Sequence, residues 1–159
     1  MVDEQLIESS GIETTKGTLG KWDGVTLEEV QEGWSEYQAS KRGDAVYGYL
    51  HMVFEQVRWW LLLPSKRQEA LRVVRAENPQ LRLPKDLYAT VILATADPHE
   101  VNGKVRSKWS RVLRYAAEYK PPNELLRDFI QRKGGINECA GRYTRHFGRQ
   151  RDRKPKKTR

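Results

Sequence analysis

The helix predicted over residues 105–119, together with Lys104 just before it, combines an apolar face with cations that could bind phosphate. At about 100° per residue, a helix here places these apolar side chains together: Val105, Trp109, Val112 and Ala116. A group of cations lies within an arc of about 120° on a different side: Lys104, Lys108, Arg111 and Arg114. Ser107 lies inside this arc and Ser110 just outside it, and both hydroxyls could donate hydrogen bonds to phosphate. A solvated helix face without a ligand is the alternative interpretation.

Residues 123–147 predict a hairpin of two helices that is similar to a helix-turn-helix. The helix expected over 123–133 ends at Gly134-Gly135, because glycine adopts the positive φ of a helix exit. A second helix is predicted over 137–147, and Ala140 is small enough for the two to cross closely. Its inner face is expected to comprise Ile136, Cys139, Ala140, Tyr143 and Phe147. Three arginines project on the opposite side, where a recognition helix meets DNA: Arg142, Arg145 and Arg149.

This hairpin resembles Fis-like DNA-binding regions, in which a glycine pair precedes a short helix with small residues. The resemblance covers about 25 of the 159 residues and implies that the second helix contacts DNA. It departs from the family pattern at Lys133, where a buried apolar residue is expected. An ordinary helical hairpin is the alternative.

The C-terminal residues 149–159 form a basic run, with Asp152 as the only acid. Its cations are Arg149, Arg151, Arg153, Lys154, Lys156, Lys157 and Arg159. We expect this tail to be disordered and to add affinity for nucleic acid without reading its sequence, because phosphate binding releases counterions. In a nucleated cell the same run could serve as an import signal. A merely solubilising tail is the alternative.

Residue types that commonly carry catalysis are scattered along the chain. His51, His99 and His146 are isolated from one another, and the lone cysteine, Cys139, falls on an expected buried face, where thiols are inert. Neither a glycine-rich phosphate loop nor a metal-ligand spacing occurs. We therefore predict that the protein is not an enzyme and needs no cofactor or metal.

The charge of the chain is concentrated in its second half. Residues 1–80 hold 9 Lys and Arg against 13 Asp and Glu, whereas residues 81–159 hold 20 against 8, and the whole chain carries +8. This asymmetry predicts a polyanionic partner, either nucleic acid (DNA more than RNA) or an acidic protein.

Membrane insertion is not expected from this sequence. The most apolar stretch, residues 46–63, contains His51, Glu55, Gln56 and Arg58, which a spanning helix would have to place in lipid. We therefore predict a cytoplasmic protein, or a nuclear one in a nucleated cell.

The spacing of apolar residues predicts an all-α fold: a single compact domain of about six or seven helices over residues 23–148. A disordered acidic segment, 1–22, is expected before it and the basic tail, 149–159, after it. The helix over 44–63 is predicted to be the centre of the bundle, because it is apolar nearly all round. One of its stripes comprises Leu50, Val53, Val57 and Trp60, and another comprises Tyr47, Phe54 and Leu61.

Together these observations predict a nucleic-acid-binding helical protein, with a regulatory role, that uses its basic C-terminal half. The alternative is a non-enzymatic interaction module that docks an acidic partner, with Trp34 and Tyr37 or the Trp59-Trp60 pair at the contact. The oligomeric state is left open.

Overall fold

The computed structural model describes residues 26–40 and 42–151, with the backbone alone at 148–151, and this part contains helices and no strand. The elements in chain order are α2 (Leu27–Ser40), α3 (Ala45–Leu62), α4 (Pro64–Glu77), α5 (Leu87–Thr95), α6 (Gly103–Tyr119), α7 (Leu126–Arg132) and α8 (Ile136–Arg151). The predicted all-α class is confirmed. Because α8 continues to Arg151, the first residues of the predicted tail are helical. The predicted segment 1–22 and residues 152–159 lie outside the described residues.

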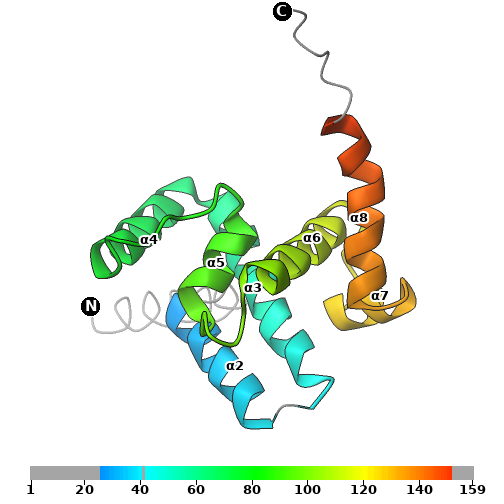
Figure 1. Ribbon diagram of the computed structural model, residues 1–159, viewed down its shortest axis with the longest axis horizontal. Helices are drawn as coiled ribbons and strands as arrows, with labels where there is room; N and C mark the ends of the chain where they lie inside the picture. Colours follow the sequence, from blue (N-terminus) through cyan, green and yellow to red (C-terminus); the bar gives the residue numbers. More distant parts are fainter. Residues whose placement is uncertain (1–25, 41, 152–159) are drawn as a thin grey trace, which may run out of the picture.

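Helix α6 connects two parts of the bundle (Figure 1). On one side, α2, α3 and α5 pack against one another and α6 packs on α5; on the other, α8 packs along α6 with α7 beside them. Helix α4 lies at the edge and packs chiefly against α3. Thus α6 contributes both to the core and to the surface that carries α8.

Side-chain caps define where three of the helices begin. The Thr26 hydroxyl accepts a hydrogen bond from the Glu29 amide (3.3 Å), and the Glu29 carboxylate accepts one from the Thr26 amide (2.9 Å). Asp86 caps α5 by accepting from the Tyr88 amide at 3.0 Å. This cap explains why α5 begins at Leu87. Asn102 caps α6 in the same way.

The central core forms around α3, as the first of its predicted stripes implies. Leu50 and Val53 are fully buried, and Val57 and Trp60 are nearly so. Trp34 of α2, Tyr49 of α3 and Trp109 of α6 form an aromatic cluster with ring centroids 5.1–6.5 Å apart. Such rings bury a large apolar area each, which offsets the modest apolar content of the chain.

The second predicted stripe of α3 does not stay buried to its end. Leu61 is 57 % exposed and its neighbour Leu62 is 64 % exposed. Helix α4 follows at Pro64 and buries only Val74 among its own residues, so it does not cover the last turn of α3. The prediction of an all-round buried helix was therefore wrong for this turn.

The glycine pair joins α7 to α8 as predicted. Gly134 and Gly135 have φ of 104° and 100°, in the region that favours glycine. Their amides donate to the carbonyls of Gln131 (3.1 Å) and Ile130 (2.8 Å), which closes the end of α7. A Cβ atom on Gly134 would lie 2.9 Å from Cγ of Glu138, so the joint also leaves no room for a side chain at this position.

Candidate nucleic-acid interface

Helix α6 carries its apolar and cationic residues on different sides. Trp109, Val112 and Ala116 are buried in the core, as predicted. The predicted cationic arc, Lys104, Lys108, Arg111 and Arg114, remains at least partly accessible to solvent. Among the described residues, only one of these four cations, Arg114, has a carboxylate within 4.0 Å. The other three have no carboxylate at ion-pair distance among those residues.

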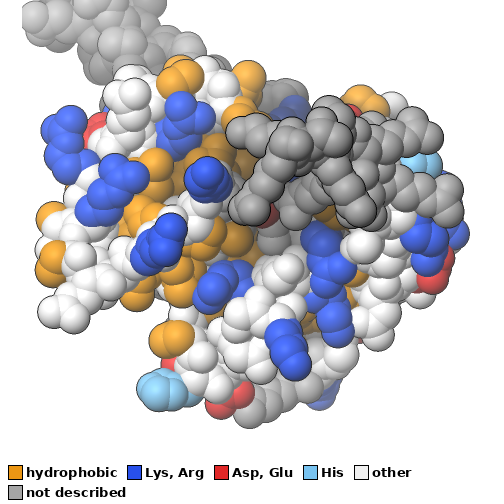
Figure 2. All heavy atoms as spheres, turned by 45° about the horizontal axis from the view of Figure 1, so that its top comes forward, with side chains coloured by type: hydrophobic (Ala, Val, Ile, Leu, Met, Phe, Trp, Pro, Cys, Tyr) orange, Lys and Arg blue, Asp and Glu red, His pale blue; other side chains and the backbone are white. Residues whose placement is uncertain are grey.

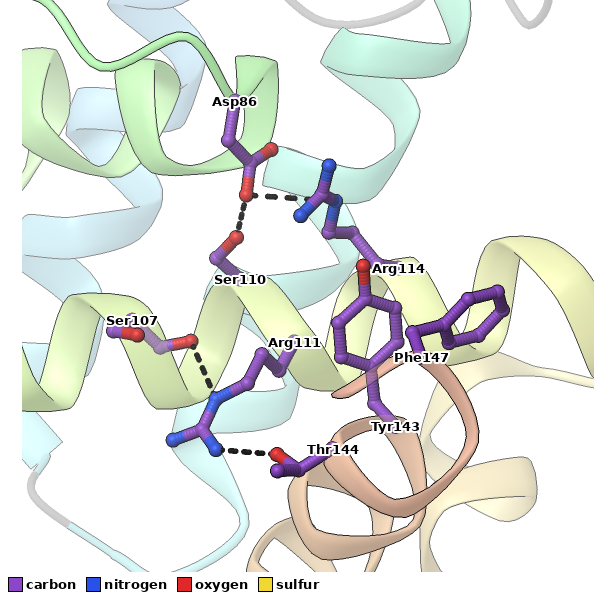
Figure 3. Close-up of a pocket in the computed structure, with 8 residues that line it drawn as sticks. All are labelled: Asp86, Ser107, Ser110, Arg111, Arg114, Tyr143, Thr144 and Phe147. Carbon is purple, nitrogen blue, oxygen red and sulfur yellow. Dashed lines mark hydrogen bonds and ion pairs between the residues drawn. The ribbon is translucent and has the colours of Figure 1, made fainter. Parts of the chain in front are cut away.

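A cleft of about 430 Å³ lies between this arc and α8 (Figure 3). We call it the α6–α8 cleft. It is lined by Asp86, Ser107, Ser110, Arg111, Arg114, Tyr143, Thr144 and Phe147. Its size falls within the usual range for small-molecule pockets. Cations, hydroxyls and two aromatic rings therefore line one space.

Arg111 bridges the two walls of the α6–α8 cleft. Its Nε donates to the Ser107 carbonyl oxygen at 3.3 Å, and its Nη1 donates to the Thr144 hydroxyl at 2.7 Å (Figure 3). A guanidinium has five N–H donors, so these two bonds leave others available. Thr144 in turn donates to the Ala140 carbonyl at 3.1 Å, which fixes its hydroxyl on α8. Arg111 is thus held in place by α6 and α8.

Arg114, by contrast, is partly neutralised. Its Nε lies 3.7 Å from the Asp86 carboxylate, and its guanidinium lies over the Tyr143 ring, 5.6 Å from the centroid. The Ser110 hydroxyl, predicted as a phosphate donor, is buried and donates to the same Asp86 carboxylate. Burial, assisted by the charge of Asp86, raises the pKa of nearby Tyr88 to about 12. Ser110 and Arg114 therefore both contact Asp86, and their roles in phosphate binding stay predictions.

The arginines predicted to project from α8 toward DNA share one acid. Glu138 accepts hydrogen bonds from Arg145 Nη2 at 2.9 Å and from Arg142 Nε at 3.2 Å. These bonds, led by that of Arg145, hold the pKa of the Glu138 carboxyl below its usual value. Tyr115 of α6, followed by Glu138, raises the pKa of Arg142. Arg142 is therefore engaged within the fold, Arg145 is exposed, and the side chain of Arg149 lies outside the described residues.

The remaining predicted cations fall at the C-terminal end. The backbone of Arg149 and Arg151 belongs to α8, which extends away from the bundle (Figure 1). Arg153, Lys154, Lys156 and Lys157 lie outside the described residues.

Two aromatic residues predicted only as packing residues also line the cleft. Tyr143 and Phe147 have ring centroids 4.6 Å apart at an interplanar angle of 31°. Their spacing of four along the sequence was visible as a helix face, but nothing in the sequence placed Arg111 beside it. Neither ring was therefore predicted to line the site.

Cys139 is fully buried in the joint between α7 and α8, where burial raises the pKa of its thiol. Its Sγ lies 3.9 Å from the Ile130 carbonyl oxygen. Within the part of the chain that the structure describes, no three His, Cys, Asp or Glu side chains come together as a metal site. None of the helices in this part is long and apolar enough to traverse a bilayer.

Comparisons of the chain with protein-family models, with curated proteins and with solved structures find no match.

Proposed function

We propose that this chain is a non-enzymatic nucleic-acid-binding protein of the cytoplasm, or of the nucleus in a nucleated cell, and that it binds DNA in preference to RNA. The observation that carries the proposal is the side of α6 bearing Lys104, Lys108 and Arg111. These three cations lie on one helix face, and no described carboxylate lies within ion-pair distance of them. Cations placed in this way bind phosphates and release counterions.

The elements on either side of this face support the same function. Helix α8 packs against α6, and its last residues, up to Arg151, are the first residues of the basic run 149–159. The net charge of residues 81–159 is +12, which attracts a polyanion over a wider surface than the three residues alone.

The helix-turn-helix hypothesis for residues 123–147 stays a prediction. A recognition helix contacts base edges chiefly with its N-terminal residues. In α8 the N-terminal turn carries Glu138, an acid already bonded to Arg142 and Arg145. We therefore assign phosphate contacts to α6 and to the basic tail, and no contact with base edges in a groove to the N-terminal turn of α8.

A charge-matched pair of variants tests the proposal. Lys104→Gln/Lys108→Gln removes two charges from the α6 face. The control Lys66→Gln/Arg127→Gln removes two charges from other exposed surfaces, where these residues pair with Glu69 and Asp44. Affinity for DNA and RNA probes is measured by fluorescence anisotropy over a series of salt concentrations.

The α6 variant should bind more weakly, and its plot of log affinity against log salt should be shallower by up to about 0.9 for each duplex phosphate that is no longer bound. The control should retain the wild-type slope. Equal losses in the two variants would mean that only net charge matters. Failure of the folded wild-type protein to bind either nucleic acid in low salt would refute the function.

A second candidate, docking of an acidic protein, is favoured by a different surface. Exposed apolar side chains occur from the end of α3 through α4 to the following loop: Leu61, Leu62, Val73 and Leu81. Residues 64–85 also carry six Lys and Arg against two Glu. On the left of Figure 2, where α4 lies, hydrophobic side chains gather with Lys and Arg among them. This composition is complementary to an acidic amphipathic helix.

The structure changes which residues this alternative would use. Trp34 and Trp60, two of the predicted contact residues, are buried, and Tyr37 and Trp59 are partly buried. An acidic, leucine-containing helical peptide should bind the full chain, and Leu62→Ser together with Arg72→Gln should abolish this binding. Unchanged peptide binding in that variant would exclude the surface.

A further inference from the structure

We propose that the α6–α8 cleft binds one unpaired nucleotide, with its phosphate at Arg111 and its base against Tyr143 and Phe147. This inference rests on the proposed nucleic-acid function and specifies the form of nucleic acid: a single strand or an unpaired end. Phosphate and base are chemically different, and the cleft provides a separate wall for each.

The phosphate side of the cleft is formed by Arg111 and Ser107. Arg111 keeps N–H donors beyond its two bonds to Ser107 and Thr144. The exposed Ser107 lines the same space, so its hydroxyl could add a neutral donor. Lys104 precedes Arg111 by two helical turns and Lys108 by one, so adjacent phosphates of a strand could follow α6 toward the cleft.

The base side is formed by the two rings of α8. Tyr143 and Phe147 are both half-buried, which leaves part of each ring accessible from the cleft. The Arg114 guanidinium lies over Tyr143 and adds a planar cation on which a base can also stack. In single-strand recognition, aromatic rings receive bases and cations follow the backbone, and this cleft combines the two.

The charge of Asp86 makes one end of the cleft less favourable for an anion than the other. Its carboxylate is held by Arg114 and by the Ser110 hydroxyl, at the end of the cleft where Arg114 lies (Figure 3). Arg111 instead points toward Thr144 and has no carboxylate within ion-pair distance among the described residues. The phosphate is therefore assigned to the Arg111 end, where the repulsion from Asp86 is weaker.

The test compares a single strand of about 12 nucleotides, as DNA and as RNA, with a blunt duplex of the same length. The full chain is studied as wild type, as Tyr143→Leu, and as the control Tyr119→Leu, which changes an exposed tyrosine of α6 outside the cleft. Arg111→Gln is a second cleft variant. Thermal unfolding establishes that each variant is folded.

Wild type should prefer the single strand. Tyr143→Leu should lower affinity for the single strand by roughly 5- to 150-fold, the equivalent of about 1–3 kcal/mol for base–aromatic stacking, and leave duplex affinity nearly unchanged. Arg111→Gln should weaken binding to the single strand more than to the duplex. A 2-aminopurine base in the strand should lose fluorescence on binding to wild type and not to Tyr143→Leu. The relative affinities for DNA and RNA show which strand is the ligand.

Failure of the nucleotide site can be distinguished from failure of the proposed nucleic-acid binding. If wild type binds duplex and single strand equally, and Tyr143→Leu affects neither selectively, the nucleotide site is wrong while nucleic-acid binding stands. If wild type binds none of the probes, both proposals fall. If Tyr143→Leu does not fold, Arg111→Gln decides the result alone, because a uniform loss on both probes would overturn the cleft assignment.

Discussion

Arg145 lies two turns after Glu138 on α8, and its Nη2 is 2.9 Å from the Glu138 carboxylate. The same oxygen accepts from Arg142, so a single acid restrains two of the arginines that the sequence predicted to face DNA. Whether Arg142 and Arg145 contribute to binding therefore depends on how strongly Glu138 competes with phosphate for these guanidinium groups.

Removal of this acid should strengthen nucleic-acid binding if α8 lies near the phosphates. Glu138→Gln keeps the size of the side chain but removes the carboxylate charge that Arg142 and Arg145 share, which adds one unit of net positive charge. We expect higher affinity and a salt dependence steeper by up to about 0.9 for each additional duplex phosphate that the variant binds. Glu36→Gln, an exposed acid of α2, is the control for net charge. If the affinity of the two variants rises equally, Arg142 and Arg145 do not touch the nucleic acid.

The basic C-terminus should add affinity without discrimination. Truncation after Arg151 preserves the residues of α8 and removes 152–159, which contain five Lys and Arg and one Asp. Affinity should fall by the same factor for every probe sequence, and the salt dependence should become shallower. Electrophoretic mobility shifts with several unrelated sequences measure this. Weaker binding to one sequence only would show that the segment reads bases.

Stability should depend on the first stripe of α3 and not on its exposed last turn. Leu50→Ala should cost about 2–5 kcal/mol, since Leu50 is fully buried and its truncation leaves a cavity. Leu62→Ala, the same chemical change on the same helix, should alter stability by less than about 0.5 kcal/mol because that side chain is 64 % exposed. Urea unfolding gives both values, and similar costs would contradict the described packing.

Tyr88 should make stability fall in alkaline solution. Its pKa is raised from 10.0 to about 12, so the unfolded chain ionises this phenol before the folded protein does. The contribution of Tyr88 is complete below the unfolded pKa and is lost as pH rises from about 10 to 12, by a total on the order of 2–3 kcal/mol. Tyr88→Phe should reduce this pH dependence of the free energy of unfolding. Tyr119→Phe, at an exposed tyrosine, should retain it.

Local spacing predicted the elements well and the site only in part. The apolar faces of α3 and α6 could be inferred because residues three and four apart share a helix side. The bond between Arg111 and Thr144 joins positions 33 residues apart, and that between Ser110 and Asp86 joins positions 24 apart. Helical periodicity carries no information about such pairs. The sequence therefore predicted the cations of α6 but neither the α6–α8 cleft nor the engagement of Ser110 and Arg114 by Asp86.

At the end of α3, the helical pattern predicts burial of side chains that are in fact exposed. Leu61 and Leu62 continue an apolar pattern, and a pattern alone predicts burial. Their exposure follows from the direction that α4 takes after Pro64, which is a property of the tertiary structure.

A side chain added at Gly134 would have a different effect from one added at Gly135, although the two glycines between α7 and α8 are adjacent. At Gly135 an added Cβ would meet nothing within 4 Å, so alanine there would cost backbone conformation alone. At Gly134 it would also press on the side chain of Glu138, the residue that binds Arg142 and Arg145. A side chain at position 134 would therefore displace the carboxylate that pairs with Arg142 and Arg145. A change in an uncharged residue, with no titratable group of its own, would redistribute the positive potential of α8.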